Sequence, residues 1–154
     1  ELMYGDKGNV PEQEYLIPIG KSNVIHEGND VTLVSFGKMM KVAEETFNVA
    51  KKENISVEVI DLRSVRPIDY ESIVKSVKKT NRLVIIEEAW PLASISSEIS
   101  HHIQRFAFDY LDAPVHRITC EDVPFHYAPT LIKEILPSVE KALKAIKSVT
   151  YKKN

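Results

Sequence analysis

The stretch RLVIIEE, residues 82–88, constrains the fold more than any other part of the sequence. Its centre is so apolar that, as a strand, it must be covered on both faces. That pattern is typical of an inner strand of a parallel sheet, which is packed between two layers of helices. The sequence therefore predicts an α/β protein in which this segment is an inner strand.

Other segments alternate between the period of a strand and the period of a helix. The turn residues Gly28, Asn29 and Asp30 separate two strands and predict a hairpin, so we expect the first strand to be antiparallel to the rest. Asp69 precedes one helix and is expected to cap it. This alternation predicts a three-layer α/β/α sandwich. The expected strands are 22–28, 31–36, 57–61, 82–88 and 115–120; the expected helices are 38–53, 70–79, 94–106 and 138–149, the last with Val139, Leu143 and Ile146 facing inward.

Charge and composition argue against several classes of protein. The net charge is −2, so no global basic field would hold nucleic acid. No apolar run approaches the roughly 18–20 residues of a membrane span. The only cysteine, Cys120, excludes an internal disulfide and fits a reducing compartment. The chain begins at Glu1 without a methionine, for which a processed terminus and a fragment of a longer protein are both open explanations.

The distribution of glycine argues against a nucleotide site. All five glycines lie between Gly5 and Gly37, and none follows from Lys38 to Asn154. Loops that cradle phosphates need glycine, because only glycine lets the backbone approach the ligand at positive φ without a clashing Cβ. The loops after the later strands are therefore poor candidates for a phosphate cradle, and no G-x-S-x-G nucleophile elbow is present.

A few reactive or aromatic side chains remain as candidates. Cys120 and His126 are compatible with a thiol nucleophile and its base, or with a buried thiol at a strand end. The adjacent His101 and His102 point about 100° apart on a helix and cannot share a metal ion, so surface histidines are expected. Trp90 is expected to anchor the core at the end of a strand.

Two arginines follow the strand in VEVIDLRSVRPID, residues 57–69. At the carboxyl end of a strand in an open sheet, Arg63 and Arg66 fit an anion site, because such sheets bind ligands there. They fit equally well a structural role in which they pin the loop through charge-assisted hydrogen bonds. In that second case, one of them should pair with a carboxylate such as Asp61 or Glu87.

Three stretches taken together carry a family resemblance: IPIGKSNVIHEGNDVTLVSFG, VEVIDLRSVRPIDYESIVKSVKKTNRLVIIEEAWP and FDYLDAPVHRITCEDVPFHYA. In this order and spacing they resemble the C-terminal part of pyruvate dehydrogenase β subunits, over residues 1–148. The β subunits that serve branched-chain 2-oxo acids and acetoin are similar. The motifs EEAWP at 87–91 and YLDAP at 110–114 favour the pyruvate enzyme.

The resemblance implies a transketolase C-terminal domain, with a five-stranded mixed sheet whose first strand is antiparallel. It implies a lead-in from an absent pyrimidine-binding domain at 1–18, the domain itself at 19–150 and a tail at 151–154. The parent heterotetramer would use thiamine diphosphate and Mg²⁺ to decarboxylate pyruvate and acetylate lipoyl groups. The resemblance places those ligands and the catalytic residues outside this segment, so it implies no catalytic, cofactor or metal residue here, and an inactive isolated domain.

The partners that the resemblance implies are an α subunit, a second β subunit and the peripheral subunit-binding domain of a dihydrolipoyl acyltransferase. Asp112 is the implied contact with a basic residue of that last partner. Neither nucleic acid nor a membrane is expected. The bacterial cytoplasm is the expected location, with the mitochondrial matrix as the alternative. Because the domain binds no substrate of its own in this family, the resemblance favours the structural role for Arg63 and Arg66.

The sequence departs from the family pattern in two places. Family members commonly have glycine at the position of Ala89 and a glycine-rich run at residues 92–97, where this chain has LASISS. The serines are expected to cap the following helix instead. Residues 151–154 extend past the apolar residue that usually ends the family's chains, so the partner contact of the tail is expected to differ.

Overall fold

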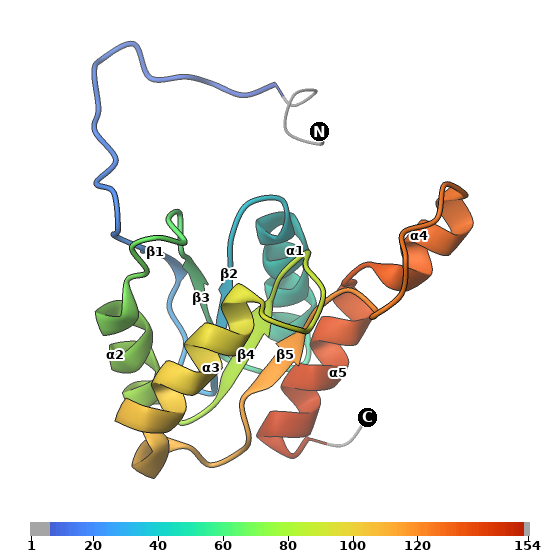
Figure 1. Cartoon of the computed structure of the whole chain (residues 1–154). Helices are drawn as coiled ribbons and strands as arrows, with labels where there is room; N and C mark the ends of the chain where they lie inside the picture. Colours follow the sequence, from blue (N-terminus) through green and yellow to red (C-terminus); the bar gives the residue numbers. More distant parts are fainter. Residues whose placement is uncertain (1–6, 153–154) are drawn as a thin grey trace.

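In the computed structural model, which describes residues 7–152, five strands form one mixed sheet in the order β1-β3-β2-β4-β5 (Figure 1). The first strand is antiparallel to its neighbour β3, and all other pairs are parallel. This confirms the predicted five-stranded mixed sheet. The strands are β1 (Asn23–His26), β2 (Val31–Ser35), β3 (Val57–Asp61), β4 (Leu83–Ile86) and β5 (His116–Ile118).

Helices cover both faces of this sheet, as the apolar strand predicted. Val84 and Ile86 of β4 pack into a core with α1 and α5, whereas Leu83 and Ile85 pack into a second core with α2 and α3. Successive side chains of a strand point to opposite faces, so β4, which has helices on both sides, is apolar at all four positions. The four helices are α1 (Met39–Lys52), α2 (Tyr70–Thr80), α3 (Ile95–Phe106) and α5 (Val139–Thr150).

A buried hydroxyl cluster fastens α2 to the middle of the sheet. The Thr32 hydroxyl on β2 lies 2.6 Å from that of Ser76 and 2.7 Å from that of Thr80. All three side chains are buried. Because buried polar groups are costly unless they are hydrogen-bonded, this cluster fixes the position of the helix along the strand.

The predicted hairpin between the first two strands is wrong. β1 pairs with β3, and β2 lies on the other side of β3. The link passes the start of β3 at very close range: a Cβ on Gly28 would lie 2.2 Å from the backbone carbon of Val57. Asp30 N–H then donates to Ser56 O at 2.8 Å. Glycine is therefore needed at position 28 because the chain passes over the start of β3 there. It is not needed for a tight turn between two paired strands.

A segment that we call the arm, residues 121–135, was not predicted. It ends in a short helix, α4 (Pro129–Ile135), and projects away from the body of the domain (Figure 1). A single 3₁₀ turn, η1 (Phe108–Tyr110), precedes β5. In α5, Ile146 is buried as expected, but Val139 and Leu143 are only half-buried, because the inward face is made by Ala142, Ala145, Ile146 and Val149.

The lead-in is extended, and its described part, residues 7–19, is exposed along its whole length. It joins the domain at Gly20, where a Cβ would lie 2.6 Å from Pro67 Cγ. Since β1 is antiparallel, this junction lies at the carboxyl edge of the parallel strands, the edge from which the arm also projects (Figure 1). Within residues 7–152 no helix combines the length and the apolar character that crossing a membrane requires.

Candidate functional site

The arginine loop after β3 is held together by its own carboxylates. Arg63 Nε lies 3.9 Å from Asp61 Oδ2, and Arg63 N–H donates to Asp61 Oδ1 at 3.0 Å. This confirms that one arginine pairs with Asp61. Arg66 is exposed and forms no ion pair within residues 7–152. The pairing of Arg63 with Asp61 supports the structural role of this loop.

Asp69 closes the same loop as the cap of α2, as predicted. Its carboxylate accepts hydrogen bonds from the backbone and hydroxyl of Ser22, at 2.9 and 3.1 Å, and from the hydroxyl and backbone of Ser72, at 2.8 and 3.3 Å. Burial raises the pKa of Asp69, but these hydrogen bonds outweigh it and leave the pKa below its ordinary value of 3.8. One carboxylate thus ties the start of β1 to the start of α2.

The thiol and imidazole of the Cys120–His126 hypothesis are not joined. Cys120 is buried at the end of β5, and burial, with Glu88 nearby, raises the pKa of its thiol. His126 is exposed on the arm, and in the described part of the chain no hydrogen bond links it to Cys120. A thiol nucleophile needs the opposite environment, which lowers its pKa. The alternative prediction of a buried thiol is confirmed.

The two histidines of α3 lie in different environments. His101 is exposed, whereas His102 is half-buried and stacks on Tyr70, with 3.8 Å between ring centroids. Burial lowers the pKa of His102. The expectation of two surface histidines is therefore correct for His101 only. Across residues 7–152 no group of three histidine, cysteine or carboxylate side chains is placed to hold a metal ion.

Trp90 does not anchor the core, in contrast to the prediction. It is 51% exposed, its indole N–H donates to Val123 O at 3.2 Å, and its ring lies against Phe125. These residues line an open depression of about 470 Å³ at the base of the arm. Trp90 therefore lies outside the core, where it contacts the base of the arm.

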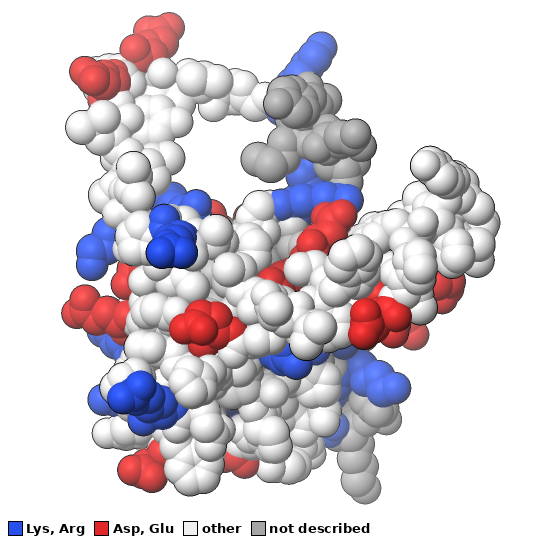
Figure 2. Space-filling model, in the orientation of Figure 1, with Lys and Arg blue, Asp and Glu red and all other residues white. Residues whose placement is uncertain are grey.

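The central part of the arm, residues 123–132, is an exposed segment without formal charge. Residues 123–132, VPFHYAPTLI, contain no acidic or basic side chain other than the histidine, and Tyr127 is fully exposed. Figure 2 shows acidic and basic residues interspersed over the body of the domain, whereas the outer part of the arm is white. Contiguous exposed apolar surface of this kind usually marks a contact with another molecule. The run of ten residues without a formal charge is the feature of the sequence from which this surface could have been predicted.

Asp112 lies at the opposite, amino edge of the sheet, between η1 and β5. Its Oδ2 pairs with Arg82 Nη2 at 3.1 Å, and its side chain is 53% exposed. Tyr151 O–H donates to the Asp112 carbonyl at 2.9 Å, so Tyr151 contacts this corner. Beside it lies a shallow depression of about 310 Å³, lined in part by Phe108 and Leu111. An exposed carboxylate at the rim of an apolar depression has the layout of a docking site.

Comparison with known proteins places this geometry in a family. Residues 20–142 match the family described as transketolase, C-terminal domain. The chain belongs to this family. A solved split-gene transketolase, described as an inactive β4 tetramer, has the same fold, with a TM-score of 0.79 and 25% identity over 90% of this chain and 45% of that one.

Curated relatives point to one branch of the family. The chain is 44% identical over 151 residues to a protein of Rickettsia felis named pyruvate dehydrogenase E1 component subunit beta, covering 98% of this chain and 46% of that protein. It is 46% identical over 156 residues to the mitochondrial protein of the same name in Dictyostelium discoideum, covering 99% of this chain and 44% of that protein. The chain thus spans about half the length of the curated relatives it matches.

Proposed function

We propose that this chain is the C-terminal domain of the β subunit of a pyruvate dehydrogenase component, and that it serves assembly and not chemistry. The observation that carries the proposal is the 44% identity to subunits of that name along 98% of the chain. In the whole enzyme, thiamine diphosphate and Mg²⁺ act outside this segment, at a site shared with the α subunit. The raised thiol pKa of Cys120 and the self-paired arginine loop support a domain without catalytic residues.

We assign docking of the dihydrolipoyl acyltransferase core to the corner around Asp112. Arg82 engages one carboxylate oxygen and leaves about half of the side chain exposed, so a basic side chain of the partner can approach. The neighbouring apolar depression, lined in part by Phe108 and Leu111, supplies the contact area that a single rim charge lacks. The rim charge would steer and orient a basic partner more than it would tighten binding.

We assign pairing with a second β subunit to the arm. Obligate interfaces are more apolar than the rest of a protein surface, and the arm presents Tyr127, Phe125 and Leu131 with no formal charge among residues 123–132. The split-gene transketolase of the same fold is described as a tetramer of β chains, which supports self-association of such domains.

The kinetic test compares Asp112→Asn with Asp109→Asn in a heterotetramer of the α subunit and the full-length β subunit. Asp109 is an exposed aspartate on η1, three residues away, and serves as the matched control. Asp112→Asn should leave pyruvate-dependent reduction of a soluble electron acceptor unchanged and should lower acetyl-CoA formation in the presence of the acyltransferase core. If both reactions fall together, or if Asp109→Asn has the same effect, the docking assignment is wrong.

A further inference from the structure

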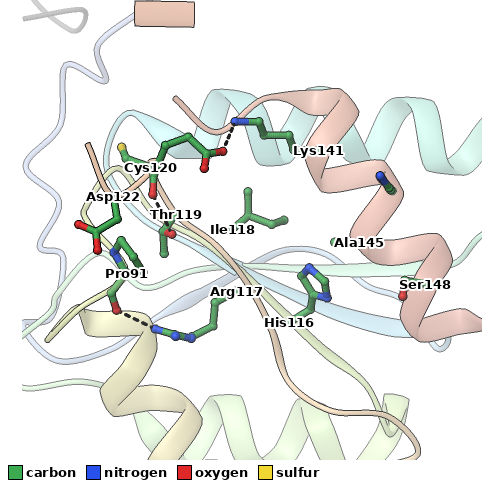
Figure 3. A pocket seen from close by; sticks show the side chains of 12 residues that line it. Pro91, His116, Arg117, Ile118, Thr119, Cys120, Asp122, Lys141, Ala145 and Ser148 are labelled. Carbon is green, nitrogen blue, oxygen red and sulfur yellow. Dashed lines mark hydrogen bonds and ion pairs between the residues drawn. The ribbon is translucent and has the colours of Figure 1, made fainter. Parts of the chain in front are cut away.

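The sheet ends in a free edge at β5. In the described part of the chain β5 pairs with β4 alone, because it is the last strand in the order of the sheet. An open groove of about 610 Å³ runs along this strand between β5 and α5 (Figure 3). A free edge presents backbone donors and acceptors to any extended chain that reaches it. The backbone groups that this edge presents, and the charges around them, decide which kind of chain it can bind.

The hydrogen bonds to β4 identify the groups that point outward. Ile118 is paired with Ile86, and its carbonyl accepts from Glu87 N–H at 3.0 Å. The pairing continues to Cys120, whose N–H donates to Ala89 O at 2.9 Å. In a parallel ladder, alternate residues direct both backbone groups to the same neighbour. Arg117 and Thr119 therefore direct their N–H and C=O groups to the free edge.

Basic side chains flank these groups, and the acidic residues that line the same groove, Glu121 and Asp122, follow the strand at its carboxyl end, where Glu121 pairs with Lys141 at 2.9 Å. Among residues 7–152, the Arg117 guanidinium is hydrogen-bonded only to neutral oxygens, of which Pro91 O lies at 3.1 Å and Ser97 Oγ at 2.5 Å. Lys144 of α5 forms no ion pair within residues 7–152. His116 lines the same groove (Figure 3). Arg117 points toward α3, whereas His116 lies on the side of α5, so basic groups stand on both faces of the free strand.

We propose that the free edge of β5 binds an extended acidic segment of another protein by strand addition. The segment would exchange backbone hydrogen bonds with Arg117 and Thr119. Adjacent residues of a strand point to opposite faces, so neighbouring acidic side chains would reach Arg117 on one face and Lys144 with His116 on the other. A second copy of this chain fits less well, because two β5 strands would bring the same basic groups together along one short ladder. The inference does not rest on the proposed function, since it uses neither Asp112 nor the uncharged residues 123–132 of the arm.

The test uses a fluorescein-labelled eight-residue peptide in which two adjacent glutamates are flanked by valine and threonine, titrated with the 154-residue chain by fluorescence anisotropy. We expect saturable binding that weakens at least tenfold in Thr119→Pro. Proline removes the outward N–H and is tolerated on edge strands, and circular dichroism checks that the variant is folded. Lys144→Glu should weaken binding at least threefold, whereas Lys75→Glu, an exposed lysine on α2, should not change it.

The same peptide with its four central amides N-methylated tests the backbone contact without altering the protein. Strand addition predicts at least a tenfold loss of affinity, whereas binding by charge alone would survive. Equal binding of both peptides, or no binding of the unmethylated peptide, would overturn the proposal. Self-association of the chain that Thr119→Pro abolishes, measured by sedimentation velocity, would also overturn it, because β5 would then be an interface between copies.

Discussion

Removing the carboxylate of Asp69 should destabilise the domain by about 3 kcal/mol. In Asp69→Ala, α2 loses its cap, which costs about 1 kcal/mol. The Ser22 N–H loses its charged acceptor in a half-buried position, which costs a further 1–3 kcal/mol or so. The hydroxyls of Ser22 and Ser72 are only half-buried and can turn to water, so they add little. A domain with a stability of about 5–15 kcal/mol would still fold.

Urea denaturation at pH 7, followed by circular dichroism, measures this loss as a change in midpoint at constant slope. Asp69→Asn is the matched control, because asparagine keeps an acceptor oxygen and is a good cap, and it should lose only about 1 kcal/mol. A loss of less than about 1 kcal/mol in Asp69→Ala would refute the argument that this carboxylate holds β1 and α2 together.

The contribution of Asp69 should also depend on pH. The pKa of Asp69 in the folded state lies below 3.8, so its stabilising effect is fully present above the unfolded pKa of about 3.9 and is lost as the pH falls through the lower, folded value. The difference in the free energy of unfolding between the wild type and Asp69→Asn should therefore shrink below about pH 4. A difference that stays constant down to pH 2 would contradict the assignment.

Three further substitutions or reactions test other parts of the structure. Ala93 has a φ of 53°, in the left-handed region that favours glycine. Ala93→Gly should therefore stabilise the domain by about 0.5–1 kcal/mol, as measured in thermal melts, whereas Ala89→Gly, at a position without positive φ, should not stabilise it. Thr32→Val removes a buried hydrogen-bond partner of the Ser76 and Thr80 hydroxyls and should lower the free energy of unfolding by about 1–3 kcal/mol. Thr150→Val should lower it much less, because the Thr150 hydroxyl bonds carbonyls of its own helix. Cys120 should react with iodoacetamide at pH 8 at least ten times more slowly in the folded chain than in urea, because burial raises the pKa of its thiol. Rapid reaction of the folded chain would contradict this and would support the hypothesis of a thiol nucleophile.

The sequence predicted the layers of this fold well because burial on two faces leaves a strong local signal. The segment 82–88 could be recognised as an inner strand because its centre, residues 83–86, has no polar position. Asp69 and Ser94 could be recognised as helix caps from their types and places. Strand order leaves no such signal. The pairing of β1 with β3 depends on the close approach of Gly28 to Val57, and a turn-like stretch beside two strands gives no information about which strand it passes.

The surface was predictable only in part, for a related reason. Trp90 was expected in the core because aromatic residues usually are buried, yet the arm provides it with a partner in Phe125 outside the core. The intramolecular pairing of Asp112 with Arg82 joins residues 30 positions apart, and no local pattern predicts it. The resemblance to a family pointed to Asp112, but only the structure describes what surrounds it.

Sedimentation velocity on this chain, alone and with the subunit-binding domain of a dihydrolipoyl acyltransferase, tests the assembly role most directly. The account predicts a dimer that takes up one partner domain, with weaker uptake by Asp112→Asn and unchanged uptake by Asp109→Asn. A chain that stays monomeric and leaves the partner domain free at tens of micromolar would contradict it.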